Sequence, residues 1–322
     1  MFLIRDLSTL FSKRDDDLLE CLGLLTRVLD GEGLNTDSGI HGQRQYVGEY
    51  LFMILAGSTP IPPRVWKMMG NLGSRLFFLN MSAREKSEEE LAGQISTKAH
   101  KEKEKICRLA TKEFLYTLWS KNPDGISWNN AEDPQEVKLI IARCAKLLAK
   151  LRGVVNVWSE RGENGTEYSY TSPIVEMPDR INQLLYNLCR GHAVVLGRTQ
   201  INEDDLKLVT ELVLDSANTI RAKLFRKLLE NNGRMTTSEV EVALKCSKPT
   251  ALKEMEILKI LGVCTQTDDD KDALKDSDGK TFWQGKIIIL SEDFKWFLGN
   301  ECKKIRGIPV EPKQDTLSEL PF

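Results

Sequence analysis

Two hydroxyl side chains, Ser58 and Thr59, follow an apolar segment of this 322-residue chain. The segment, Leu51 to Ala56, is dense enough in large aliphatic residues to predict a strand buried on both faces of a sheet. Pro60 ends the strand, because proline cannot donate to the ladder. In an open α/β sheet, ligands bind just beyond the carboxyl ends of the strands. We therefore expect Ser58 and Thr59 to face a bound polar ligand.

A carboxylate is expected at the same edge of this sheet. The first residues, Met1 to Ile4, are apolar and predict the end of a second buried strand, which Asp6 and the hydroxyls of Ser8 and Thr9 follow. The polar groups that follow the two strands would then meet at one sheet edge. The alternative is a frayed terminal strand whose Asp6 caps the next helix.

Arg75 is a single cation between two apolar segments. A helix is predicted from Val65 to Leu72, and a further apolar run, Leu76 to Leu79, follows Gly73-Ser74-Arg75. This order places the guanidinium of Arg75 at the rim of the sheet. The alternative is a strand-turn-helix unit with an ordinary surface arginine.

The composition is that of a globular protein long enough for two or three domains. Hydrophobic residues make up 41% and charged residues 29% of the chain, and the net charge of −2 means that any nucleic-acid surface must be local. No apolar run approaches the ~18–20 residues of a membrane span, and the N-terminus lacks the features of a signal peptide. We therefore expect no membrane partner and a cytoplasmic location.

Cysteine and histidine usage argues against a zinc site. The seven cysteines are scattered without a C-x-x-C pair, and the three histidines are isolated, which favours a reduced cytosolic compartment. His192 is expected to pack within a helix rather than to bind a metal. The chain also shows no Ser/His/Asp or Cys/His pairing and no dinucleotide fingerprint, which makes a self-contained metabolic enzyme the least favoured class.

Helical periodicity predicts most of the middle of the chain. Ser82 to Lys105 is highly charged and predicts a solvated helix or linker, whereas Ile106 to Trp119 is amphipathic and is expected to pack. The other predicted elements are helices at 16–29, 134–151, 180–196 and 203–216, and a β-hairpin near 154–171 with an Asn164-Gly165 turn.

From residue 218 onward the predicted order of elements is that of a winged helix: helix, helix, turn, helix and a two-stranded wing. The helices are predicted at 220–229, 240–244 and 249–261, and the strands at 263–267 and 286–290. Side chains at the exposed start of the third helix would meet base edges and phosphates; they are Ser247, Lys248, Thr250 and Lys253.

DNA is the partner that this local charge favours. From Arg221 to Lys259, nine Lys or Arg oppose five Glu, which leaves +4. The acidic loop Asp268 to Lys280 counts against deep insertion of the wing into a minor groove. Winged helices also serve as protein-contact modules, so an adaptor role stays open.

Taken in order, these motifs resemble the second half of an AAA+ ATPase, nearest its MoxR and minichromosome-maintenance branches. Met1 to Thr9 (MFLIRDLST) is similar to the Walker B strand, and Leu51 to Pro60 to the sensor 1 strand. Leu72 to Phe78 (LGSRLFF) resembles the arginine-finger segment, and Met177 to Leu206 resembles the helical lid. Within the lid segment, Gly197-Arg198 and Asp204-Asp205 match the family's GR…V…D pattern.

The resemblance implies ATP and Mg²⁺ as cofactors and gives each matched residue a role. Asp6 would support Mg²⁺ indirectly, and Ser58 or Thr59 would occupy the sensor 1 position. Arg75 would reach the γ-phosphate of a neighbouring subunit in a homo- or hetero-oligomeric ring, and Arg180 would be sensor 2. The fold implied is mixed α/β and mostly α: a partial AAA+ core at 1–81, a helical lid at 82–217, a winged helix at 218–299 and a loose tail at 300–322.

Three departures from the family pattern limit the implied activity. Leu7 stands where the family has a catalytic Glu, sensor 1 lacks its usual Asn, and no G-x-x-x-x-G-K-[ST] occurs in the chain. Without that loop the backbone nest and lysine for the phosphates are missing, so this polypeptide alone should bind ATP poorly. Whether the chain is an enzyme is therefore left open.

Two explanations of the missing loop stay open. The first is that the chain is part of a longer ATPase, which a core-type strand at Met1 favours. The second is that it is a degenerate subunit that lends Arg75 to an intact partner. We expect the C-terminal portion of a DNA-acting, helicase-like or replication-related motor subunit. The alternative is a non-enzymatic winged-helix DNA-binding regulator or adaptor.

Overall fold

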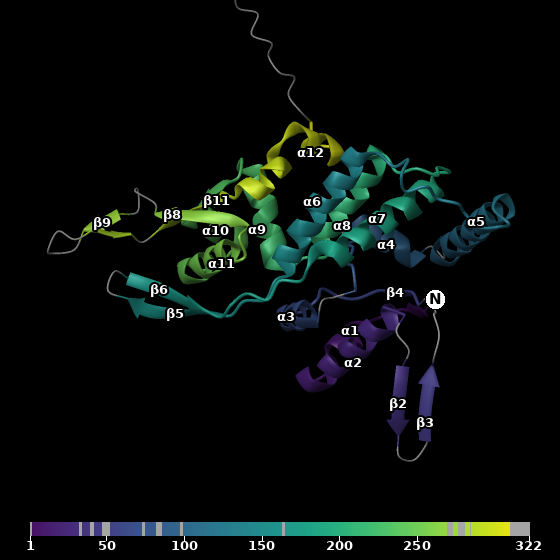
Figure 1. The fold of residues 1–322 in the computed structure, drawn as a ribbon, viewed down its shortest axis with the longest axis horizontal. Helices are drawn as coiled ribbons and strands as arrows, with labels where there is room; N and C mark the ends of the chain where they lie inside the picture. Colours follow the sequence, from purple (N-terminus) through teal and green to yellow (C-terminus); the bar gives the residue numbers. More distant parts are fainter. Residues whose placement is uncertain are drawn as a thin grey trace, which may run out of the picture.

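Helices make up most of the fold, and the sheets are small, as the computed structural model shows (Figure 1). The predicted mixed α/β, mostly helical class is therefore confirmed. The structure describes residues 2–31, 34–38, 42–46, 52–72, 75–81, 86–96, 99–162, 165–268, 273–275, 281–283 and 285–309.

The N-terminal unit is built around two parallel strands, which pair in the register Leu3 to Leu55. Strand β1 is followed by the short helix α1 and by α2, and a hairpin separates α2 from β4 and α3. The elements are β1 (Phe2–Ile4), α1 (Ser8–Phe11), α2 (Asp15–Leu29), β2 (Leu34–Ser38), β3 (Gly42–Tyr46), β4 (Ile54–Ala56) and α3 (Pro63–Leu72).

The prediction that both strands are buried on two faces is wrong. Each strand has three residues, and the paired side chains of Leu3 and Leu55 are 68% and 64% exposed. Ile4 packs on the other side against a cluster from α1, α2 and α3 that includes Phe11 and Trp66. A parallel sheet is normally covered on both faces, and here the described residues cover one.

Two helices follow this unit, and the prediction for the second is wrong as well. They are α4 (Glu88–Ser96) and α5 (Ala99–Lys121). The segment Ile106 to Trp119, expected to pack, lies within α5 and presents most of its large apolar side chains to solvent. Figure 1 shows why: α5 projects at the edge of the molecule instead of lying across the other helices.

A helical body forms the centre of the molecule, where α6 packs against α7 and α8. Its apolar stripes interlock around fully buried residues such as Leu148, Leu185 and Val209. A β-hairpin extends between α6 and α7, as predicted, although Asn164 of its turn lies outside the described residues. The elements are α6 (Gln135–Arg152), β5 (Val157–Gly162), β6 (Gly165–Tyr170), α7 (Pro178–Val195), a 3₁₀ turn (Glu203–Asp205) and α8 (Leu206–Asp215).

The C-terminal unit has three helices and a three-stranded antiparallel sheet in the order β7-β11-β8. Asn218 caps the first helix by accepting the N–H groups of Ile220 and Arg221, and Thr236 and Glu239 form a capping box on the second. The elements are α9 (Thr219–Glu230), β7 (Arg234–Thr236), α10 (Thr237–Leu244), α11 (Lys248–Ile260), β8 (Cys264–Asp268), β9 (Ala273–Lys275), β10 (Thr281–Trp283) and β11 (Lys286–Leu290).

The chain does not become loose at residue 300. A 3₁₀ segment (Glu292–Leu298) leads into α12 (Asn300–Ile305), whose Cys302 is fully buried in the core shared with α6 to α11. The predicted tail at 300–322 is therefore wrong for its first six residues, and 310–322 lie outside the described residues.

A buried arginine joins the N-terminal unit to the helical body. Arg152, at the end of α6, donates from Nε to the carbonyl of Ser216 (2.9 Å) and from Nη2 to the carbonyl of Leu76 (2.8 Å). Its guanidinium also lies over the ring of Phe77 and 3.7 Å from a carboxylate oxygen of Glu176. Burial lowers the pKa of Arg152 to about 10, so the side chain stays charged at neutral pH.

A second buried arginine joins the helical body to the C-terminal unit. Arg221, in the first turn of α9, donates to the carbonyls of Leu151 (3.0 Å) and Gly153 at the end of α6. These carbonyls have no partner within their own helix, because a helix leaves its last C=O groups unsatisfied. Through Arg152 and Arg221, the N-terminal unit, the helical body and the C-terminal unit all meet at the end of α6.

Candidate functional site

The edge of the two-stranded sheet is arranged as the sequence predicts. After the strands end, the N–H of Gly57 donates to Ile4 (3.0 Å) and the N–H of Leu7 donates to Gly57 (2.8 Å). These bonds bring Asp6 and Ser58 to the same edge, beyond the carboxyl ends of β1 and β4. Both side chains, and that of Thr59, are exposed.

The polar groups at this edge are engaged locally. Asp6 accepts hydrogen bonds from the N–H (2.8 Å) and the hydroxyl of Ser8, and these bonds lower the pKa of its carboxyl group, the hydroxyl contributing most. These bonds close a turn just before α1, but Leu7 is the N-cap residue of that helix and no side chain caps it, so Asp6 does not take the capping role left open as the alternative. Ser58 donates to the carbonyl of Thr59 (2.8 Å).

Arg75 points inward, toward the end of α2. Its Nε lies 2.9 and 3.1 Å from the two carboxylate oxygens of Asp30, its Nη2 contacts the same carboxylate, and its Nη1 donates to the carbonyl of Leu72 (3.1 Å). Only 11% of the Arg75 side chain is exposed. The neighbouring Ser74 lies outside the described residues.

Arg180 lies near the same group of charges. It stands exposed in the first turn of α7. The hydrogen bond from Arg75 lowers the pKa of Asp30 most, and the charges of Arg75 and Arg180 lower it further. The pKa of Glu176 is raised by burial, against the opposing charges of Arg152, Arg75 and Arg180.

The charges of Arg75 and Arg180 both lower the pKa of Asp30 and oppose the rise in the pKa of Glu176, and Arg75 also contacts Asp30 directly. Asp6 bonds to Ser8 at the strand edge. One exposed carboxylate and two hydroxyls do not by themselves fit Mg²⁺ or a triphosphate. Within the described residues, no group of three or more His, Cys, Asp or Glu could hold a metal ion.

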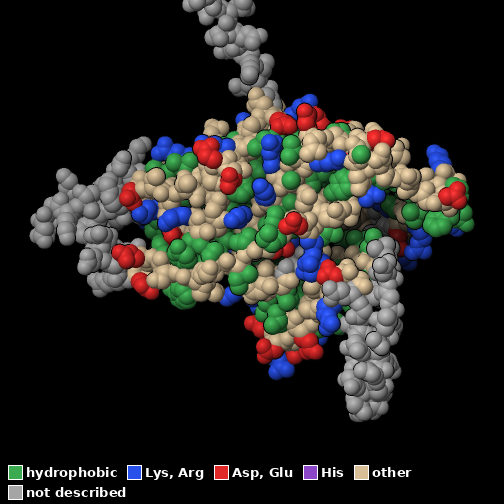
Figure 2. Space-filling model, in the orientation of Figure 1, with side chains coloured by type: hydrophobic (Ala, Val, Ile, Leu, Met, Phe, Trp, Pro, Cys, Tyr) green, Lys and Arg blue, Asp and Glu red, His purple; other side chains and the backbone are tan. Residues whose placement is uncertain are grey.

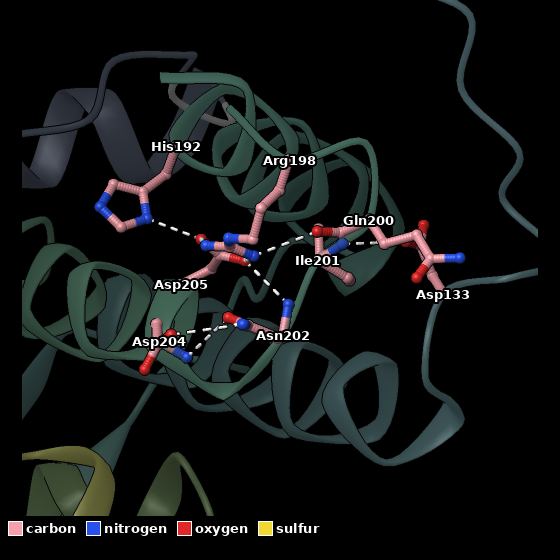
Figure 3. A network of polar contacts seen from close by, with 8 residues as sticks. All are labelled: Asp133, His192, Arg198, Gln200, Ile201, Asn202, Asp204 and Asp205. Carbon is pink, nitrogen blue, oxygen red and sulfur yellow. Dashed lines mark hydrogen bonds and ion pairs between the residues drawn. The ribbon is translucent and has the colours of Figure 1, made fainter. Parts of the chain in front are cut away.

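Arg198, Asp204 and Asp205 of the GR…V…D pattern belong to one polar network around the buried carboxylate of Asp205 (Figure 3). The carboxylate of Asp205 is fully buried and accepts two bonds from Arg198 (3.0 and 2.8 Å), one from the N–H of Asn202 (2.8 Å) and a contact with His192 Nδ1 (2.6 Å). Burial raises the pKa of Asp205, but the bonds from Arg198, Asn202 and His192 outweigh it and leave this pKa lowered. The network fixes the turn between α7 and α8.

Asp133 extends this network on the other side of the turn (Figure 3). Its carboxylate accepts from the N–H of Ile201 (3.0 Å), from Trp128 Nε1 (2.9 Å) and from the hydroxyl of Tyr186. These contacts occupy both carboxylates, so we assign the Asp133 and Asp205 clusters to holding the turn between α7 and α8 against the start of α6.

The start of α11 presents the side chains predicted to meet DNA. Ser247, Thr250 and Lys253 are exposed, and Lys248 is partly exposed. The hydroxyls of Ser247 and Thr250 lie 3.1 Å apart. Farther along the helix, Glu256 and Ile257 are buried, and strand β5 lies against α11. The first turns of α11 are therefore the part open to a ligand.

Sequence patterns missed the groups that hold these regions in place. Asp30, Arg152 and Arg221 each make their main contact with a residue more than 40 positions away, and no local spacing signals such a pair. Asp133 gave a weak signal, since it directly precedes the proline that opens α6.

Comparison with known proteins finds no relative: no protein-family model, no curated protein and no solved structure matches this chain significantly. In the described part of the chain, no helix combines the length and the apolar character needed to cross a membrane.

Proposed function

We propose that this chain is the C-terminal portion of a DNA-acting AAA+-type motor subunit and that it contacts duplex DNA through the start of α11. The observation that carries the DNA contact is the topology of residues 219–290: three helices, a β7-β11-β8 sheet, and exposed polar side chains where the third helix begins. This order and sheet arrangement support a winged helix.

Two features support the AAA+ part of the proposal. The parallel pairing of β1 and β4 collects Asp6 and Ser58 at one edge. Arg75 pairs with Asp30, and the charge of Arg180 lowers the pKa of the same carboxyl group. No P-loop occurs among the 322 residues. The nucleotide phosphates would therefore have to be held by a P-loop from another segment or subunit, and this chain would supply surrounding charge.

DNA contact is tested by fluorescence anisotropy with a labelled duplex of about 20 base pairs. The double variant Lys248→Ala/Lys253→Ala removes two cations from the proposed contact. Each phosphate contact contributes about −0.9 to the slope of log K against log salt, so we expect a slope shallower by about 2. The matched control, Lys259→Ala/Lys295→Ala, removes the same charge at side chains that pair with Glu256 and Glu292.

The two double variants discriminate local contact from net charge. The proposal expects weakened binding and a reduced salt slope in the α11 variant, with the control near the parent. Equal slopes in the parent and the α11 variant would show that α11 is not the DNA-binding helix, whatever the role of the AAA+-like part.

A non-enzymatic DNA-binding regulator is the second candidate, and the Arg75–Asp30 contact favours it. A guanidinium that is 89% covered and holds Asp30 is not displayed toward another subunit. The test supplies a P-loop segment, either by extending the chain or by adding a partner, and measures ATP turnover of the Arg75→Ala variant. The control is Arg64→Ala, which removes a different ion-paired arginine. Loss confined to Arg75→Ala supports the motor, whereas unchanged or equally reduced turnover supports the regulator.

A further inference from the structure

Helix α5 carries a continuous stripe of basic and aromatic side chains. The basic residues are spaced four, three and four positions apart, and the aromatic residues follow at four and seven positions. At 3.6 residues per turn, this spacing puts all of them on one face of a helix. The stripe consists of Lys101, Lys105, Arg108, Lys112, Tyr116 and Trp119.

The stripe is exposed along its whole length. All six side chains are open to solvent, and Tyr116 and Trp119 are 68% and 78% exposed. Figure 1 shows α5 projecting from the body, and Figure 2 shows apolar side chains gathered at that end with basic side chains beside them. Arg108 lies 3.3 Å from Glu104, a surface pair that contributes little and is easily exchanged for another anion.

Charge on α5 differs in sign from charge on the whole chain. From Ala99 to Lys121 there are six Lys or Arg and three Glu, a net +3, whereas the chain as a whole carries −2. At about 100° per residue, Glu102, Glu104 and Glu113 are rotated about 60–120° from Lys101 around the helix axis, so they flank the stripe, and Glu104 contacts Arg108 from its side. The stripe is therefore a local cationic surface suited to a polyanion.

The geometry of the stripe favours an extended nucleic-acid strand. With a rise of 1.5 Å per residue, its cations are about 4.5–6 Å apart and the stripe is about 27 Å long. Surfaces that bind a few nucleotides of a single strand combine two features: cations that follow the phosphate backbone and aromatic rings on which the bases stack. The two rings of the stripe stand at one end, beyond its cations.

A membrane surface fits the same helix less well. An interfacial helix needs an apolar face opposite its basic face over most of its length. In α5 the five residues 101–105 are all charged, so an apolar face opposite the stripe, which includes Ile106, Phe114 and Leu118, is confined to the later part of the helix. Basic and aromatic groups thus follow one another along one face instead of occupying opposite faces.

We propose that α5 is a second nucleic-acid surface, which binds single-stranded nucleic acid through the basic stripe and stacks bases on Tyr116 and Trp119. This surface is separate from α11 and does not depend on the function proposed for that helix. On α5, single-stranded nucleic acid would bind away from the residues proposed to surround ATP.

The test uses the full chain and a fluorescent 20-nucleotide oligothymidylate. Lys105→Ala/Lys112→Ala removes two stripe cations, and Lys103→Ala/Lys121→Ala removes two exposed lysines from the opposite face of the same helix. At about −0.7 per contact for single strands, the stripe variant should reduce the salt slope by about 1.4, whereas the control keeps the parent slope.

Stacking is tested with Trp119→Leu, which we expect to weaken binding roughly 5- to 150-fold and to remove the quenching of tryptophan fluorescence on binding. The matched control is Trp158→Leu, at a tryptophan on the hairpin of which 51% is exposed. Circular dichroism of each variant confirms that the helix content is unchanged. Lys248→Ala/Lys253→Ala should leave oligothymidylate binding as it is in the parent.

Three outcomes would overturn the proposal. Equal loss of binding in the two lysine variants would show a net-charge effect without a site. Binding to phosphatidylserine vesicles through the stripe, without binding to the oligonucleotide, would assign the helix to a membrane surface. A dimer in light scattering that Trp119→Leu dissociates, with oligonucleotide binding unaffected, would assign it to contact between copies of this chain.

Discussion

The guanidinium of Arg75 holds the carboxylate of Asp30 by two of its nitrogens and so ties the segment after α3 to the end of α2. The contact is mostly covered, with 11% of the arginine and 22% of the aspartate side chain exposed. The contact points Arg75 into the molecule, whereas the resemblance to AAA+ ATPases would place this residue at a boundary between subunits. Any role of Arg75 toward another subunit therefore requires this contact to open.

Removing either partner should destabilise the N-terminal unit. Hydrogen bonds to charged groups contribute about 1.5–3 kcal/mol, and the low exposure of this pair limits screening. A double-mutant cycle with Arg75→Ala and Asp30→Ala, measured by urea unfolding, should give a coupling free energy of about 1–3 kcal/mol. The same cycle on Arg64 and Asp15, a more exposed pair, should give less than about 1 kcal/mol. Equal coupling in the two cycles would contradict a special role for the Arg75 contact.

The contribution of Asp30 should depend on pH in a known direction. Because its pKa in the folded chain is below the value of 3.8 for a free side chain, the folded state favours the charged form. The stabilisation is therefore complete above pH 3.8 and is lost as the pH falls through the folded-state pKa. The difference in unfolding free energy between the parent and Asp30→Asn should shrink on acidification from pH 6 to pH 3. A constant difference over this range would contradict the lowered pKa.

Local sequence signals predicted the elements better than their environment. Helical periodicity placed the helices of the body and of the C-terminal unit close to their observed bounds, as at 134–151, 220–229 and 249–261. The apolar runs at 1–4 and 51–56 predicted strands that do pair, yet burial of Leu3 and Leu55 depends on covering layers that a run of apolar residues does not reveal.

The candidate site was predicted in part for the same reason. Strand ends fixed the position of Asp6 and Ser58, since that depends on local order and parallel pairing. The pairing of Arg75 with Asp30 joins residues 45 positions apart, and competing acceptors cannot be ranked without the fold. The α5 stripe was visible as spacing in the sequence, but its exposure followed only from the way the helix projects.

Gly70 should be required where α3 meets the end of α6. A Cβ at this position would lie 2.7 Å from the carbonyl oxygen of Arg152 and 2.6 Å from Val154 Cγ2. Gly70→Ala should therefore destabilise the chain, because a backbone atom must shift. Gly23 in α2 has no atom within 4 Å of its Cβ position, so Gly23→Ala should stabilise by about 0.5–1 kcal/mol. Thermal unfolding of both variants measures the contrast, and stabilisation by both would contradict close packing at Gly70.

Asp205 and Asp204 should respond differently to the same substitution. Asp205 is fully buried and holds Arg198, His192 and the N–H of Asn202, whereas Asp204 is exposed. Asp205→Asn leaves a partly buried guanidinium without its counter-charge and should cost about 3–5 kcal/mol in unfolding free energy. Asp204→Asn should change it by less than about 0.5 kcal/mol. A small effect of Asp205→Asn would mean that the turn between α7 and α8 is held by packing alone.

Arg152 should be the most sensitive single position at the junction of the N-terminal unit and the helical body. Arg152→Met keeps the volume of the side chain but leaves the carbonyls of Leu76 and Ser216 without this donor and the carboxylate of Glu176 without this counter-charge. Breaking a buried charge contact of this kind costs about 3–5 kcal/mol. Because the carbonyl of Leu76 is one of the links to the N-terminal unit, limited proteolysis near residues 76–81 should also accelerate. Lys146→Met, at an exposed position of the same helix, should change neither quantity. Loss of stability without faster cleavage would show that the N-terminal unit stays attached through Phe78 and Asn80, whose N–H groups donate to Ser216 and Asp215.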